Sequence, residues 1–195
     1  VAAMSVPDAL NILALCSLIP AALVPLRARA ERDSHFWAAV LLAVLGPSLW
    51  SVRLLWTAWQ TDLGTTLWVS IAASAALFAV LAARTACGWR LAPLLMPYLL
   101  ALGLLASAVG GQARPLASMA AAVWLDLHIV VSVLTYALLT LAAMASLAVF
   151  LQERALKHKR PNRLTRLLPA VRDGEGLAGG LLAASEVVLG LGLAT

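Results

Sequence analysis

The sequence predicts an all-α fold, a polytopic bundle of transmembrane helices, from its hydropathy and from the spacing of its charges. Mean hydropathy is +0.93 and only 12% of residues are charged, whereas soluble domains carry about 25%. Five uncharged runs have 17 to 23 residues each, close to the roughly 20 that a helix needs to cross a bilayer. Because lipid cannot satisfy backbone amides, such runs are expected to be helices.

Six spans are expected, and together they form a single transmembrane domain over residues 1–195. Charged and turn-forming residues bound the expected spans at 9–26, 36–59, 63–83, 91–109, 121–151 and 177–195. Pro20 and Pro25 are expected to kink or end the first span. The sixth span is still apolar at Thr195.

The basic residues lie mainly in alternate loops. The loops after the first, third and fifth spans carry 3, 2 and 7 Lys and Arg residues, and the loops after the second and fourth carry 0 and 1. Positive loops face the cytoplasm, so the N-terminus is expected on the outer side of the membrane. This placement explains the pI of about 10.0 without nucleic acid as a partner.

Motifs for catalysis are missing from the sequence. There is no GxSxG, no HExxH and no phosphate-binding GxxxxGK[ST] loop. The two cysteines, Cys16 and Cys87, do not form a CxxC pair. The chain is therefore expected to bind and deliver a ligand rather than to catalyse with its own side chains.

The stretch WLDLHIVVSVLTY, residues 124–136, places a histidine inside an apolar segment. Residues three or four apart share one face of a helix. Polar and aromatic residues at this spacing form one stripe: Trp124, His128, Ser132, Thr135 or Tyr136, and Thr140. The stripe is expected to face other helices or a cavity, as helix–helix contact or as a ligand site. Neutral imidazole is a common axial ligand of haem iron.

This segment resembles the cytochrome c assembly protein family, of the CcsA/CcmC/HemX type. The shared pattern is a Trp, a His four residues later and a Tyr eight residues after that, at the outer start of a helix. The segments LAVFLQERALKHK (147–159), LLPAVRDGEGL (167–177) and LLMPYLLALGLL in the fourth span are also similar. The closest resemblance is to the short YpjD/HemX-like inner-membrane proteins, which have about eight spans.

The resemblance implies a membrane haem-handling protein of cytochrome c biogenesis. His128 would be the axial ligand of haem iron at the outer membrane face, with Trp124, Ser132 and Tyr136 beside the haem. Apocytochrome c and other maturation subunits would be the partners. The alternative is a HemX/YpjD-like structural or regulatory inner-membrane protein without bound haem. The resemblance also implies a C-terminally truncated member of the eight-span fold, with the second axial ligand and any tryptophan-rich motif beyond Thr195.

Four other ionisable residues are further candidates for a site. His35 and His158 have charged or basic neighbours and are expected to lie in solvated loops at the cytoplasmic face. Arg53 either extends to the outer interface or pairs with a haem propionate. Glu186 lies about ten residues into the sixth span, where a lone charge is costly. It is expected to be protonated, paired or lining a cavity.

Overall fold

The computed structural model describes residues 6–27, 31–56, 62–109 and 122–193, and all regular structure in these ranges is helical. The long helices are α1 (Val6–Leu23), α2 (Ser34–Leu55), α3 (Leu63–Arg84), α4 (Ala92–Val109), α5 (Ala122–Lys157) and α7 (Val171–Leu193). Three short elements connect them: the 3-10 turns η1 (Val24–Leu26) and η2 (Gly88–Leu91), and helix α6 (Arg163–Leu167). The all-α prediction is confirmed.

Five segments are long and apolar enough to cross a membrane. They are Ser34–Leu55, Leu63–Arg84, Gly88–Val109, Leu127–Lys157 and Val171–Leu193. The apolar stretch of the first helix, Ala9–Leu23, is shorter. The prediction of membrane-spanning helices is thus supported for five of the six expected spans.

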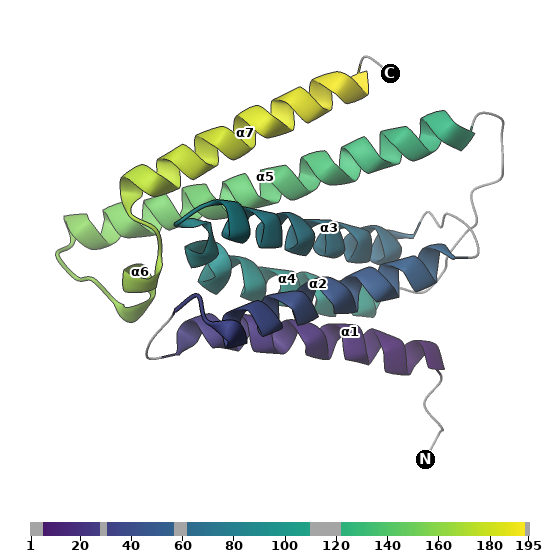
Figure 1. The fold of residues 1–195 in the computed structure, drawn as a ribbon, viewed down its shortest axis with the longest axis horizontal. Coiled ribbons are helices and arrows are strands. Elements are labelled where there is room, and N and C mark those ends of the chain that lie inside the picture. Colours follow the sequence, from purple (N-terminus) through teal and green to yellow (C-terminus); the bar gives the residue numbers. More distant parts are fainter. Residues whose placement is uncertain (1–5, 28–30, 57–61, 110–121, 194–195) are drawn as a thin grey trace.

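The helices form two groups. Helices α1 to α4 pack side by side as an up-and-down bundle, and α5 packs on this bundle mainly through α3 (Figure 1). Helix α7 returns antiparallel along α5 and forms the outer layer (Figure 1). Two glycines of α7 give the register between α5 and α7, because each lies against a valine of α5. A Cβ at Gly174 would meet Val149, and a Cβ at Gly192 would meet Val131.

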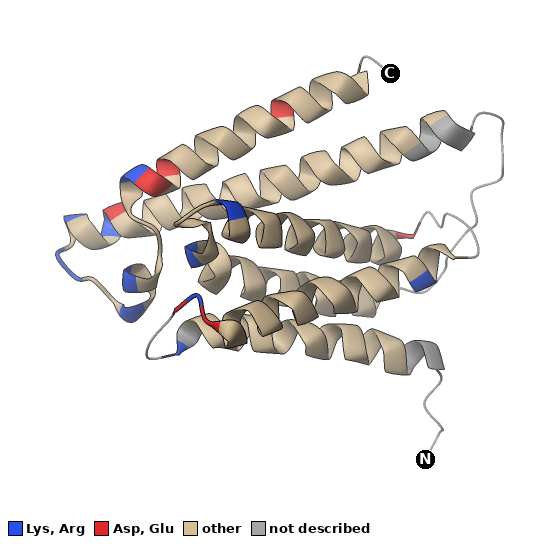
Figure 2. Ribbon diagram, in the orientation of Figure 1, with Lys and Arg blue, Asp and Glu red and all other residues tan. Residues whose placement is uncertain are grey.

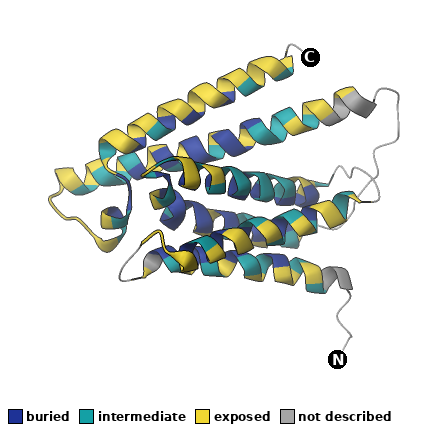
Figure 3. Cartoon of the chain, viewed as in Figure 1, coloured by how far each residue is buried: buried dark blue, intermediate teal, exposed yellow. Residues whose placement is uncertain are grey.

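Small and medium-sized side chains fill the interior. Buried alanines lie on every helix of the bundle, and Phe78, Ile71 and Leu141 are among the largest fully buried side chains. Alanine lets helix backbones approach closely, as in membrane bundles. Exposed large hydrophobic residues cover the outside along the length of the helices (Figure 3). An apolar exterior of this kind suits contact with lipid.

Polar side chains define where the helices begin. Asp33 caps α2 by accepting a hydrogen bond from Phe36 N at 2.8 Å, and Asp62 caps α3 by accepting one from Thr65 N at 3.3 Å. The hydrogen bond from Phe36 N lowers the pKa of the Asp33 carboxyl group. Asn162 and Thr165 form a reciprocal capping box at the start of α6. Each cap satisfies a backbone N–H that the helix leaves unpaired.

Two helices extend beyond the spans expected from the sequence. Helix α5 continues to Lys157 rather than ending at 151, and α7 begins at Val171 rather than at 177. Both extensions are rich in charged residues, and most of their residues are exposed. Charges mark where a span is expected to leave the lipid, but a helix can continue past that point into water. The expected end of the second span, at 59, falls outside the described residues.

Basic residues gather at one end of the molecule. The segment after α1, the η2 turn and the segment around α6 carry most of the described Lys and Arg residues, and all three lie at the same end (Figure 2). Arg53 is at the opposite end, in the last turn of α2. The expected alternation of basic and non-basic loops therefore corresponds to two opposite ends of the bundle.

Candidate functional site

Helix α5 carries the candidate site near its N-terminal end. The helix has 36 residues, or about 54 Å at 1.5 Å per residue, so it is longer than the roughly 30 Å core of a bilayer. His128 is six residues after Ala122, about 9 Å along the axis. This position is at the end of the bundle opposite the basic segments.

Three residues of the predicted stripe lie on the exposed side of α5. Trp124 is 59% exposed and Tyr136 is 66% exposed, and His128 between them is exposed as well. The expectation that these side chains face other helices is wrong for the part of the chain that the structure describes. Their surface consists of two aromatic rings and one imidazole at four- and eight-residue spacing, open to an incoming ligand.

The two threonine hydroxyl groups of the stripe bond to their own helix. Thr135 Oγ1 donates to Val131 O at 2.8 Å, and Thr140 Oγ1 donates to Tyr136 O at 2.8 Å. Thr135 is buried, whereas Ser132 is half-buried. Because the carbonyl four residues earlier satisfies these hydroxyls, they do not require a neighbouring helix.

The other histidines are far from His128. His35 Nδ1 lies 3.2 Å from Asp33 Oδ2 at the start of α2, and both side chains are substantially exposed. His158 follows the last residue of α5, about 45 Å from His128 along the axis. Among the described residues, no group of three or more His, Cys, Asp or Glu side chains could hold a metal ion. His128 is thus a single candidate ligand.

Glu186 and Arg53 are both exposed and lie on different helices. Glu186 is on the outer helix α7, and no described residue forms a hydrogen bond or ion pair with it. By the register of α5 and α7, its level corresponds to that of Ala137, nine residues beyond His128. Arg53 occupies the last turn of α2, where a cation is favourable to the helix dipole. The structure does not bring either residue to His128.

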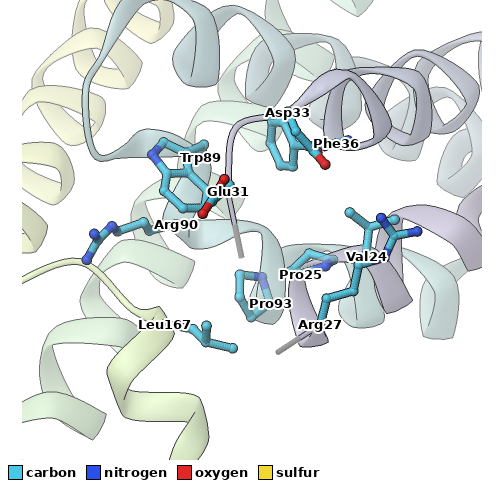
Figure 4. Close-up of a pocket in the computed structure, with 10 residues that line it drawn as sticks. All are labelled: Val24, Pro25, Arg27, Glu31, Asp33, Phe36, Trp89, Arg90, Pro93 and Leu167. Carbon is cyan, nitrogen blue, oxygen red and sulfur yellow. Dashed lines mark hydrogen bonds between the residues drawn. The ribbon is translucent and has the colours of Figure 1, made fainter. Parts of the chain in front are cut away.

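Sequence reasoning missed a cluster at the basic end (Figure 4). Trp89 packs edge-to-face on Phe36 with ring centroids 6.0 Å apart, and the Arg90 guanidinium lies 5.5 Å from the Trp89 ring centroid. A hollow of about 10 Å³ beside them is also lined by Arg27, Glu31 and Asp33, among others. The tripeptide GWR at residues 88–90, with an aromatic next to an arginine at the start of a span, was the available signal.

The fold defines the class of this protein: all-helical in the described residues, with five helices long and apolar enough to span a membrane and an exposed histidine on its longest helix. The chain is 48% identical over 191 residues to a protein of Azospirillum brasilense, described as "Uncharacterized 28.8 kDa protein in nifR3-like 5'region". The match covers 95% of this chain and 70% of that protein. The chain belongs to the same family as the Azospirillum protein. No protein-family model and no solved structure matches the chain.

Proposed function

We propose that this protein handles haem in cytochrome c biogenesis, binding it near the outer face of a bacterial inner membrane for attachment to apocytochrome c. The observation that carries the proposal is the exposed imidazole of His128 between Trp124 and Tyr136 on one face of α5. The resemblance of this helix to the cytochrome c assembly family supports it. Haem would be the cargo of this protein rather than its resident cofactor.

The residues of this face suit a flat, amphipathic ligand. An exposed imidazole offers a nitrogen to iron, and the rings of Trp124 and Tyr136 offer apolar surface one and two turns away. Among the described residues, His128 belongs to no cluster of three or more metal-ligating side chains, so this face would supply one axial ligand. Such a five-coordinate arrangement suits transfer, because only one protein–iron bond has to break.

The orientation belongs to the same proposal. The basic segments would lie in the cytoplasm, since positive loops stay inside. This would place the N-terminus and His128 at the outer face, with α1 as a sixth span. Glu186 and Arg53 would take no direct part in this ligand site, because neither is beside His128.

A second candidate is a structural or regulatory membrane protein that binds no haem. The observation that favours it is the position of the other histidines, which lie at the opposite end of the bundle and cannot complete a two-histidine site. Haem content of the purified protein separates the two candidates.

The test compares His128→Ala with His158→Ala. Both proteins are purified from cells supplied with haem, and haem stoichiometry and the Soret band are measured. His128→Ala is expected to lose haem or to shift the Soret band, and added imidazole is expected to restore the band partly. His158→Ala is expected to behave as wild type.

The exposed position of His128 makes this test clean. Surface substitutions away from specific contacts change stability by about 0.5 kcal/mol or less, so folding should be unaffected. An unchanged Soret band at wild-type haem stoichiometry in His128→Ala would overturn the ligand assignment. A wild-type protein without haem would favour the structural candidate.

A further inference from the structure

A shallow, open groove at the basic end of the molecule combines Arg90 with residues of two segments more than 60 positions later in the sequence. Its volume is about 270 Å³, far more than the roughly 10–15 Å³ needed for one water molecule. Arg90 comes from η2, Gln152 from α5, and the rest from the segment around α6. The lining residues are Arg90, Gln152, Pro161, Thr165, Arg166, Leu168 and Ala170.

Gln152 fixes the α6 side of the groove. Its Nε2 atom donates to Thr165 O at 2.7 Å and lies 3.2 Å from Pro169 O. The capping box of Asn162 and Thr165 shapes the start of the same short helix. These bonds tie α6, and with it Arg166, to the C-terminal part of α5.

The η2 side is fixed by aromatic packing. Trp89 Nε1 donates to Ala86 O at 3.0 Å, and its ring packs on Phe36. Arg90 stacks on the Trp89 ring and also lines the neighbouring hollow in Figure 4. A stacked guanidinium keeps its N–H groups free to donate at the ring edge.

Neither arginine has an acidic partner among the residues that the structure describes. Arg90 and Arg166 are both exposed, and the ion pair of the described residues joins His35 to Asp33. Asp173, in the first turn of α7, is close enough to affect Cys87 but forms no ion pair with either arginine. Two arginines that line one groove and form no ion pair make it attractive to an anion.

We propose that this groove binds a phosphate group, which Arg90 and Arg166 hold from opposite sides. Arginine presents a fork of N–H donors that matches phosphate oxygens. The groove lies where the apolar helices end, so in a membrane it would be near the lipid headgroups, and basic pockets at this level bind anionic headgroups. The phosphate can therefore belong to an anionic lipid or to a soluble phosphate compound.

This site is separate from the proposed haem face. Gln152 is 24 residues from His128 on the same helix, about 36 Å along the axis. The phosphate proposal therefore stands or falls independently of haem binding.

The experiment uses the purified chain in nanodiscs of two compositions. Discs of phosphatidylcholine alone are compared with discs that also contain phosphatidylglycerol, and bound lipids are counted by native mass spectrometry. Inorganic phosphate is titrated in the phosphatidylcholine discs, with the melting temperature as readout. Retained phosphatidylglycerol would identify a lipid, and a shift with inorganic phosphate alone would identify a soluble anion.

Arg90→Gln and Arg166→Gln are the test variants, and Arg160→Gln is the control. Arg160 is exposed in the same basic segment but does not line the groove. Its substitution therefore removes one positive charge outside the groove. Each test variant is expected to weaken binding about tenfold or more, as expected for loss of charged hydrogen bonds. The control is expected to bind as wild type.

Arg166→Gln keeps the test valid if Arg90→Gln folds poorly, because Arg166 is exposed on α6 and has no stacking partner among the described rings. Equal binding by wild type and Arg166→Gln would overturn the proposal. Equal losses in Arg166→Gln and Arg160→Gln would also overturn it, since they would indicate general charge attraction. No response to either probe would do the same.

Discussion

Gly46 lies where α2 packs closely against α1, and substituting it tests how tightly these helices pack. A Cβ atom at position 46 would lie 2.6 Å from Ser17 Cβ and still closer to Ser17 Oγ, with the backbone of Ala14 at 3.5 Å. Carbon atoms in contact prefer about 3.5–4.0 Å. Rotating the Ser17 hydroxyl cannot relieve the contact with Ser17 Cβ, so α1 must move by about 1 Å in Gly46→Ala.

The control for this substitution is Gly180→Ala. A Cβ at Gly180, in the interior of α7, would meet no atom within 4 Å. Both substitutions share the gain in helix propensity of about 1 kcal/mol, so their difference isolates the overpacking. Overpacking typically costs about 1–3 kcal/mol. A cavity of about 170 Å³ beside Gly46 gives α1 room to shift. The expected loss of stability in Gly46→Ala is therefore in the lower part of this range, about 1–2 kcal/mol.

The free energy of unfolding is measured in mixed micelles by titration with sodium dodecyl sulfate, with tryptophan fluorescence as the signal. Gly46→Ala is expected to be less stable than Gly180→Ala by that amount. Adding Ser17→Gly to Gly46→Ala should restore most of the loss, whereas Ser17→Ala should restore less because its Cβ remains. Equal stability of Gly46→Ala and Gly180→Ala would refute the close α1–α2 contact.

Two further predictions concern the basic end. Gln152→Leu removes the hydrogen bond from Nε2 to Thr165 O and is expected to lower the free energy of unfolding by about 1 kcal/mol. Hydrogen exchange should become faster over residues 163–170 only, and the exposed neighbour Glu153→Gln serves as the control. Unchanged exchange in Gln152→Leu would contradict the anchoring role of Gln152. Burial, and then the charge of Asp173, raises the pKa of the Cys87 thiol, so iodoacetamide should modify it more slowly at pH 8 than a free cysteine, because less thiolate is present. Asp173→Asn should lower that pKa and speed the reaction in a Cys16→Ala background, and an unchanged rate would show that Asp173 has no electrostatic effect there.

The positions of the long apolar helices were largely predictable from the sequence. Runs without charge identified the helices that could cross a membrane, because burying a charge in lipid is costly whatever its neighbours are. The ends of α5 and α7 were not predictable in this way. Gln152 to Lys157 and Val171 to Gly176 lie at the basic end, where the helix continues outside the apolar run.

The components of the candidate site were also visible in the sequence. The four-residue spacing of Trp124, His128, Ser132 and Tyr136 correctly indicated one helix with a shared side. The groove between Arg90 and Arg166 was not visible, because residues 76 positions apart in sequence meet only after α5 and α6 have packed.

The sequence by itself determined that this chain forms apolar helices, where they lie, and which loops are basic, because these are properties of each segment alone. Tertiary structure decided which face of each helix is buried. A soluble helix reveals its buried face by alternating apolar and polar sides, but α5 is apolar almost all round, with alanine, leucine and valine on every side. Its buried face therefore depends on where α3 and α7 pack, and that packing places Thr135 inside and His128 outside.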